Sequence, residues 1–187
     1  AVCADDWLVI EVGEIPIRHC ISLAKAVREK GARVALDVDL DPICQCGATA
    51  DDVEELFALS NLIIPNVNSL SSIYGETNPA ALCRHISEQY GVSVVVTAGA
   101  DGAYFTDGNG HICHRAALPI TAVDTVGAGD AFHGGLLYAV CGKMPLADAV
   151  DLATVCAAAN CMAFGAREGM PDHEKVEEML RWLKNNV

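Results

Sequence analysis

The sequence predicts an α/β protein with a mostly parallel sheet flanked by helices. Short apolar runs of strand length alternate with segments of helical periodicity through the first half of the chain. Such alternation is typical of parallel βαβ units. Of the 187 residues, 52% are hydrophobic and 20% are charged, which indicates a globular protein with a large core. We therefore expect a single α/β domain over residues 1–187.

Four segments of the first half have the length and apolar character of strands, at residues 7–12, 32–38, 61–64 and 92–97. Three helices are expected between them, at residues 17–31, 51–59 and 79–90. The first helix carries an apolar stripe formed by Ile17, Ile21, Ala24 and Val27. The second opens with acidic residues that suit the positive end of a helix dipole. Gly31 and Gly91 are typical helix ends.

The pattern changes after Thr97. Residues 103–106 and 111–114 flank the segment Asp107-Gly108-Asn109-Gly110, whose residue types favour a tight turn, so we expect a β-hairpin there. Three successive helices are expected after the hairpin, at residues 129–141, 145–164 and 172–186.

The charge of the chain excludes two classes of partner. Lysine and arginine number 12 against 25 acidic residues, which gives a net charge of −13. A chain this acidic, with no basic run, is a poor candidate for binding nucleic acid or an anionic membrane. The longest uncharged run, residues 56–75, contains asparagines, a proline and several serines, so it does not fit a membrane span.

The nine cysteines could indicate disulfides or a metal site. Their number is odd, and no Cys-x-x-Cys pair begins a zinc site. We therefore expect reduced, structural cysteines and a cytoplasmic location. The sequence shows no signal peptide and no initiator methionine, and we expect it to be a fragment.

The most informative segment is Asp124-Thr125-Val126-Gly127-Ala128-Gly129-Asp130. Glycines at 127 and 129 permit backbone angles that other residues avoid, and an apolar helix follows at once. Backbone N–H groups at a helix N-terminus form an anion site, so these residues could hold a phosphoryl group while Asp130 accepts a proton from a hydroxyl. In the simpler interpretation, Asp130 only complements the helix dipole and the glycines only form a turn.

Two better-known glycine motifs do not fit this segment. It lacks the third glycine of the dinucleotide-binding motif, and no clean strand precedes it. The chain also contains no Gly-Lys-Ser/Thr, so a Walker-type phosphate loop is absent from the sequence.

A family resemblance begins at this motif. Residues 124–135, DTVGAGDAFHGG, resemble the C-terminal signature of the PfkB (ribokinase-like) carbohydrate kinases. Residues 94–102 are similar to that family's strand and T-x-G-x-x-G turn, and Asn66 follows a strand and a proline like the family's asparagine beside ATP. The stretch 165–171 resembles the segment before the last helix of many sugar kinases. The resemblance extends from about Trp7 to the C-terminus.

The resemblance implies a ribokinase-like sheet and a kinase that transfers the γ-phosphoryl group of ATP to a hydroxyl of a sugar or sugar-like molecule. Asp130 would be the catalytic base, and an anion hole would be formed by the backbone of Gly127, Ala128 and Gly129. Mg²⁺ and the phosphates of ATP would lie near Asn66. The nucleotide pocket would be lined by Thr97, Gly99, Gly102 and Thr154. A monovalent cation, usually potassium, would be held by Asp124, Val126 and the backbone near Gly165.

The resemblance also implies a small-molecule partner such as a sugar or sugar acid, and a homodimer. Two features depart from the family pattern. Ser69 stands where members usually carry an acid that organises magnesium. The N-terminal part of the family fold, with the sugar pocket and a small β-lid, is missing from the 187 residues. Two alternatives therefore stay open, a silent nucleotide-binding or assembly module and a vitamin or nucleoside kinase of the same superfamily.

Other candidate residues favour structural roles. His133, one turn beyond Asp130, is expected to pack or to form hydrogen bonds rather than carry protons. Three alternating acids after the second strand, Asp37, Asp39 and Asp41, are expected to be turn residues rather than a metal cluster. Arg167 could contact a phosphate or a helix end, and the sequence does not decide between the two.

Overall fold

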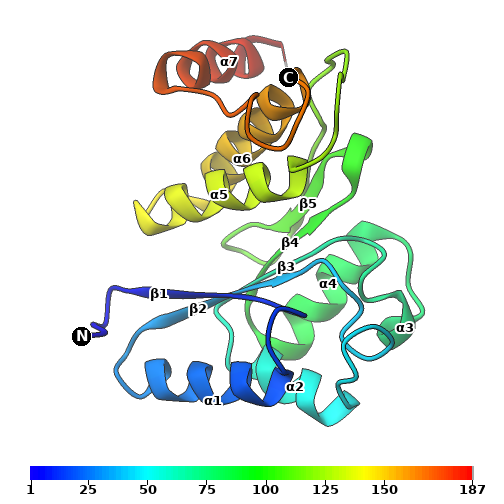
Figure 1. The fold of residues 1–187 in the computed structure, drawn as a ribbon, viewed down its shortest axis with the longest axis vertical. Coiled ribbons are helices and arrows are strands. Elements are labelled where there is room, and N and C mark those ends of the chain that lie inside the picture. Colours follow the sequence, from blue (N-terminus) through cyan, green and yellow to red (C-terminus); the bar gives the residue numbers. More distant parts are fainter. Residues whose placement is uncertain (187) are drawn as a thin grey trace. The chain divides into compact units, whose positions relative to one another are not determined.

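The computed structural model describes residues 1–186, and these form two compact units (Figure 1). The first unit comprises residues 1–98 and 104–113. The second comprises residues 99–103 and the described residues from 114 onward. The expectation of one α/β domain over residues 1–187 stays a prediction.

The strands form a six-stranded mixed sheet in the order β1-β2-β3-β4-β5-β6. They are β1 (Trp7–Glu11), β2 (Arg33–Val38), β3 (Leu62–Pro65), β4 (Ser93–Thr97), β5 (Ala103–Thr106) and β6 (Ile112–Arg115). Strands β1 to β4 pair in parallel, with Leu36 opposite both Ile10 and Ile63. The connections 98–102 and 107–111 are too short for a parallel crossover, so β5 and β6 run antiparallel to their neighbours. The predicted mostly parallel sheet is confirmed.

The helices of the first unit are α1 (Ile17–Arg28), α2 (Ala50–Ala58), the short α3 (Ser71–Tyr74) and α4 (Pro79–Tyr90). Because the order of the parallel strands equals their order in the chain, right-handed crossovers place α1, α2 and α4 on the same face of the sheet. Figure 1 shows these three helices along one side of β1 to β4. The predicted helices and strands of this half are confirmed to within a few residues, whereas α3 was not predicted.

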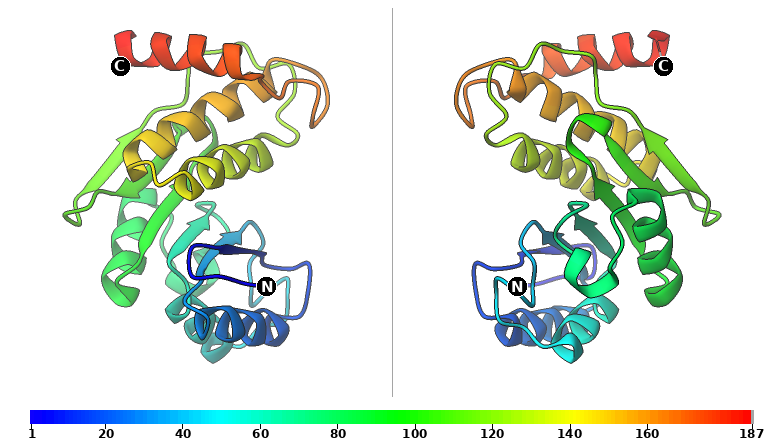
Figure 2. Two further views of the ribbon diagram at one scale, coloured as in Figure 1. Left: turned by 90° about the vertical axis from the view of Figure 1, so that its left-hand side faces the viewer. Right: turned by 90° about the vertical axis from the view of Figure 1, so that its right-hand side faces the viewer.

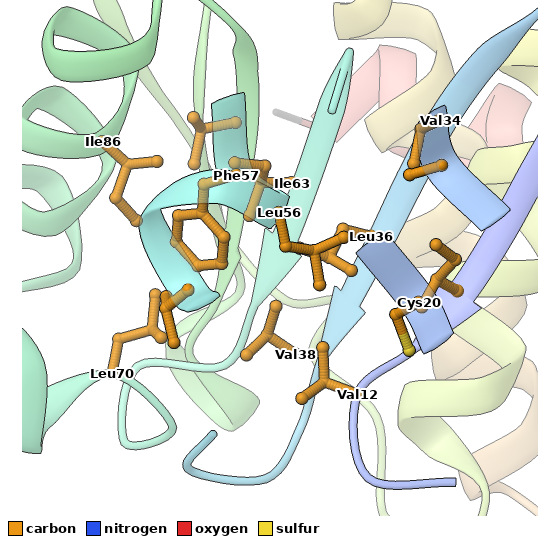
Figure 3. Close-up of a cluster of buried hydrophobic side chains, with 14 of the residues drawn as sticks. Val12, Cys20, Val34, Leu36, Val38, Leu56, Phe57, Ile63, Leu70 and Ile86 are labelled. Atoms are coloured by element: carbon orange, nitrogen blue, oxygen red, sulfur yellow. The ribbon is translucent and has the colours of Figure 1, made fainter. Parts of the chain in front are cut away.

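The core of the first unit lies between this helical layer and the sheet (Figure 3). Leu36, Val38 and Ile63 point from the strands toward Leu56 and Phe57 of α2. All five side chains are at most 1% exposed. Burial of this many large aliphatic and aromatic groups is the main force that holds α2 on the sheet.

Local signals fix the helix ends that the core then holds in place. Thr49 and Asp52 form a capping box at the start of α2, in which each side chain accepts a hydrogen bond from the other residue's backbone N–H. Asn78 caps α4, and Pro79 occupies its first turn. Gly91 ends α4 in the left-handed conformation, with φ of +65°.

The second unit contains the 3₁₀ turn η1 (Gly99–Asp101) and the helices α5 (Ala128–Cys141), α6 (Leu146–Cys161) and α7 (His173–Asn186). Helices α5 and α6 lie side by side (Figure 2). They approach closely at Gly135, where an added Cβ would lie 3.1 Å from the Cα of Ala153. Met179 and Leu183 of α7 pack on Val155 of α6. The expected helix at 145–164 is shorter in the structure, because α6 ends at Cys161.

None of the helices within residues 1–186 reaches the length and apolarity that a bilayer crossing demands. The cytoplasmic location stays a prediction. All nine cysteines are free thiols, and four of them are buried, namely Cys20, Cys83, Cys156 and Cys161. That the nine stay reduced in the cell remains a prediction.

We predict that Leu56→Ala lowers the free energy of unfolding by about 2–5 kcal/mol, because it opens a cavity between α2 and the sheet. Urea denaturation of the protein measures this loss. The matched control is Leu23→Ala on α1, whose side chain is 45% exposed and whose loss costs less than about 1 kcal/mol. Equal losses for the two variants would show that α2 does not pack as described.

Candidate functional site at the start of α5

The loop before α5 is held against the end of α6. The backbone N–H groups of Val123 and Asp124 both donate to the carbonyl oxygen of Cys161, at 2.8 and 3.3 Å. Asn160 is fully buried, and its side-chain Nδ2 donates to the carbonyl oxygen of Val126 at 3.0 Å. Three hydrogen bonds thus position a loop that has no regular structure of its own.

The carboxylate of Asp124 joins two loops. Its Oδ1 accepts a hydrogen bond from the N–H of Val126, and its Oδ2 accepts one from the N–H of Gly165, both at 3.0 Å. These backbone donors at Val126 and Gly165 lower the pKa of Asp124 below its usual value. The three residues proposed for the monovalent cation therefore lie together in the second unit. That they hold a cation stays a prediction.

Gly127 is required by both its conformation and its surroundings. It precedes α5 with φ of +75°, in the left-handed region. A Cβ at this position would lie 2.7 Å from the carbonyl oxygen of Ala166 and 2.9 Å from its Cα. Any other residue would therefore push the two loops apart.

Gly129 does not use the backbone freedom that a glycine permits. Gly129 lies inside the first turn of α5, and the positive φ is confined to Gly127. One left-handed residue is enough to turn the chain from the loop into the helix, so the next residues already have helical angles.

The first turn of α5 presents backbone N–H groups together with a carboxylate. Within residues 1–186, no side chain caps this helix. The N–H of Ala128 donates to the carbonyl oxygen of Thr125 at 3.2 Å, which leaves the other amides of the first turn to a ligand. Asp130 is exposed in that turn. Uncapped amides and the helix dipole attract an anion, and the carboxylate beside them can accept a proton.

The first unit places Asn66 and Thr97 side by side, where β3 and β4 end. The two residues form a parallel bridge, and the N–H of Val67 donates to the carbonyl oxygen of Thr97 at 2.9 Å. Ligands of open parallel sheets bind beyond the carboxyl ends of the strands. Both residues therefore lie at the edge of the sheet where the sequence predicts a bound nucleotide.

The side chain of Asn66 is engaged by its own neighbourhood. Its Oδ1 accepts hydrogen bonds from the N–H groups of Asn68 and Ser69, both at 2.9 Å. Its Nδ2 donates to the carbonyl oxygen of Asp39 at 2.8 Å and lies 3.4 Å from Oδ1 of the same residue. Ser69 is buried, and its hydroxyl donates to the carbonyl oxygen of Asn66. A carboxylate thus lies beside Asn66, but Asp39 supplies it and position 69 does not.

Gly99 and Gly102 bound the turn after β4, and each has a positive φ, of +57° and +99°. A Cβ on Gly102 would lie 2.0 Å from the carbonyl oxygen of Arg115, whereas one on Gly99 would meet nothing within 4 Å. Thr154 is buried on α6, where its hydroxyl donates to the carbonyl oxygen of Val150 at 2.8 Å. The roles of these three residues toward a nucleotide stay predictions.

Among the remaining candidates, His133 and Asp41 have structural contacts, whereas Asp37 lies within strand β2 and is not the turn residue that the sequence predicts. His133 is buried in α5 with its ring against Phe132, as a packing role requires. The carboxylate of Asp41 accepts hydrogen bonds from the N–H groups of Ile43 and Cys44, which is the contact of a turn residue. Sequence reasoning missed Asn160. The signal for it is a lone amide at the end of the apolar helix 146–161.

Comparison with known proteins identifies the relatives of this chain. The model of the "pfkB family carbohydrate kinase" matches residues 8–173. The chain is 28% identical over 183 residues to ribokinase of Lactococcus lactis, a match that covers 98% of this chain and 57% of that protein. It therefore spans little more than half the length of such relatives.

Solved structures of sugar and riboside kinases also resemble this chain. Aminoimidazole riboside kinase from Salmonella enterica, complexed with aminoimidazole riboside and an ATP analog, has a TM-score of 0.78 and 26% identity, over 93% of this chain and 62% of that one. Ribokinase from Arabidopsis thaliana, complexed with ribose and ATP, has a TM-score of 0.75 and 26% identity, over 94% of this chain and 55% of that one. The fold of the chain is that of the ribokinases.

We predict that Gly127→Ala lowers the free energy of unfolding by about 2 kcal/mol or more, because alanine is strained at positive φ and collides with the backbone of Ala166. Thermal or urea unfolding measures the change. Gly134→Ala on the same helix is the control. Its Cβ would meet nothing within 4 Å, so it should stabilise α5 by about 0.5–1 kcal/mol. A neutral Gly127→Ala would contradict the described loop.

The lowered pKa of Asp124 predicts a pH-dependent contribution to stability. Because the folded protein favours the ionised carboxylate, this contribution is complete above the unfolded pKa of about 3.9 and is lost as pH falls through the lower, folded pKa. Asp124→Asn should therefore destabilise the protein at pH 7, and the difference from the wild type should shrink below about pH 4.

Urea titrations between pH 3 and pH 8 measure this difference. Glu174→Gln, on the exposed start of α7, is the matched control that removes a charge without removing these hydrogen bonds. A gap between wild type and Asp124→Asn that does not change with pH would refute the assignment.

Proposed function

The chain belongs to the pfkB family of carbohydrate kinases, and from this premise we propose that the protein transfers the γ-phosphoryl group of ATP to a hydroxyl of a sugar or sugar-like small molecule. The observation that carries the proposal is the start of α5, where uncapped amides and the carboxylate of Asp130 occupy one helical turn. Relatives crystallised with ribose and ATP, or with aminoimidazole riboside and an ATP analog, support this substrate class.

In this proposal the residues of the first turn divide the chemistry between them. Asp130 orients the acceptor hydroxyl and takes its proton as the oxygen attacks phosphorus. The backbone N–H groups of Gly127 and Gly129 would face the negative charge that develops on the transferred group. The N–H of Ala128, the third member of the predicted anion hole, donates to the carbonyl oxygen of Thr125 at 3.2 Å and would have to exchange that bond for the ligand. Asp124 acts on this turn only indirectly, because it fixes the loop from which the helix starts.

ATP with Mg²⁺ would supply the phosphoryl group and neutralise its charge. Thr97, Gly99, Gly102 and Thr154 are the proposed nucleotide-binding residues. The magnesium ion would lie near Asn66 and Asp39, at the ends of β3 and β2. Mg²⁺ prefers one or two carboxylates together with phosphate oxygens. Because the amide oxygen of Asn66 already accepts two hydrogen bonds, Asp39 is the better ligand of the pair.

The residues around Asp124 fit a monovalent cation such as potassium. A carboxylate oxygen and a carbonyl oxygen each keep a second lone pair when they accept one hydrogen bond, so Asp124 and Val126 can still coordinate an ion. The neighbouring Oδ1 of Asn160 is buried, and no donor within residues 1–186 reaches it. An ion held there with the backbone near Gly165 would satisfy polar atoms that are otherwise costly to bury.

The main alternative is a nucleotide-binding module without catalytic activity. Ser69 favours it, since its hydroxyl is committed to the backbone of Asn66 and provides no carboxylate. A nucleoside kinase of the same superfamily is the second alternative, and the similarity to aminoimidazole riboside kinase favours it. A homodimer and the absence of nucleic-acid and membrane partners are part of the proposal.

We predict that Asp130→Asn lowers kcat of the full-length protein by about 10²–10⁴-fold and leaves the Kd for ATP within about twofold, because the amide cannot accept the proton. Release of ADP with Mg·ATP and a panel of sugars, sugar acids and ribosides measures turnover. Calorimetry measures ATP binding. Asp148→Asn, an exposed acid in the first turn of α6, is the control and should retain activity.

The outcomes separate the candidate functions. Turnover with one acceptor that is lost in Asp130→Asn supports the kinase and names its substrate. ATP binding without turnover on any acceptor supports the silent module. An Asp130→Asn protein that keeps more than a tenth of wild-type turnover removes Asp130 from the mechanism.

A further inference from the structure

The last two residues of β6 contact both the turn 99–102 and helix α6, all within the second unit. His114 contacts the turn, and its Nε2 lies 2.7 Å from the carbonyl oxygen of Asp101 and 3.9 Å from the carboxylate of the same residue. The contact tethers the turn one residue before Gly102.

The backbone of Arg115 and of the two residues after it packs directly against the turn. The space beside Gly102 is filled by the carbonyl oxygen of Arg115 and the backbone of Ala116 and Ala117, each within 3 Å of where a Cβ would stand. The turn therefore touches β6 both through a hydrogen bond and through direct backbone packing.

The side chain of Arg115 extends the connection to α6. Its Nε lies 2.6 Å from Oδ1 of Asp151, and both side chains are largely buried, at 23% and 11% exposure. Burial raises the pKa of Asp151, while the charge of Arg115 acts in the opposite direction. Asp151 precedes Thr154 by nearly one helical turn, so both residues belong to the same stretch of α6.

We propose that His114 and the Arg115–Asp151 ion pair are positioning residues that fix the turn 99–102 relative to helix α6, and so preorganise the site for the nucleoside part of ATP. The inference rests on the proposed function, because it concerns the nucleotide that the turn and Thr154 would bind.

A turn bounded by glycines needs such a support. Gly99 and Gly102 allow many backbone angles, so the free turn loses more conformational freedom when a ligand orders it. Contacts that hold it in place beforehand reduce this cost and so increase affinity. Removal of one of these contacts should therefore weaken nucleotide binding while it leaves the chemical step at Asp130 unchanged.

The test compares four variants of the full-length protein by calorimetry with ATP and by steady-state kinetics. His114→Leu and Asp151→Asn each remove one contact, and they should raise Kd and KM for ATP about fivefold, the equivalent of one hydrogen bond of about 1 kcal/mol. kcat and KM for the acceptor should stay within twofold. His114→Gln retains a donor at the position of Nε2 and should restore wild-type affinity. Glu174→Gln, on the exposed start of α7, should behave as wild type.

The outcomes distinguish this inference from the function on which it rests. A wild-type protein that binds no ATP would overturn both. A wild type that binds ATP as tightly as His114→Leu and Asp151→Asn do would overturn the positioning role alone. The positioning role is also overturned if His114→Gln binds ATP as weakly as His114→Leu does, because the donor at Nε2 would then not matter. A kcat that falls in parallel with the affinity for ATP would overturn it too, because it indicates a general loss of structure.

Discussion

The second unit depends on one carboxylate. The loop that leads into α5 has no regular structure, and its course is set by Asp124, which holds the N–H groups of Val126 and Gly165 at the same time. With those two loops joined, Gly127 can lie against Ala166, and the first turn of α5 begins at a fixed place. The first turn of α5 and the position of Asp130 both follow from this bridge, and in the proposed function Asp124 acts on that turn only through the loop that it holds.

The charge distribution of the chain explains why backbone groups are important for attracting an anion to the start of α5. The protein carries a net charge of −13, and no lysine or arginine occurs between Arg115 and Lys143. In the proposed function, ATP would meet no side-chain cation from that stretch, so oriented peptide dipoles and bound cations would supply the attraction there. The uncapped start of α5 provides the dipoles, and the oxygens around Asp124 and beside Asn66 can provide the places for cations.

Periodicity and turn chemistry predicted most of the fold, because the strands and helices of βαβ units carry strong local signals. The four-residue helix α3 is too short to show a period, and it escaped prediction. The motif at 124–130 located the candidate site, yet it did not separate Gly127, which needs its positive φ, from Gly129, which does not. Some residues act through contacts between segments that are distant in sequence, as Asn160, His114 and Asp151 do. No local sequence pattern predicts such contacts.

The order of the strands also bears on how the protein folds during its synthesis. In β1 to β4 each strand pairs with the one made just before it, so the sheet can grow by local steps as the chain leaves the ribosome. The loop of Asp124 is different, because its partners at Asn160 and Gly165 are made roughly forty residues later. The sheet β1 to β4 can therefore form before residues 160–165 are made, whereas the loop that leads into α5 acquires its partners only afterwards.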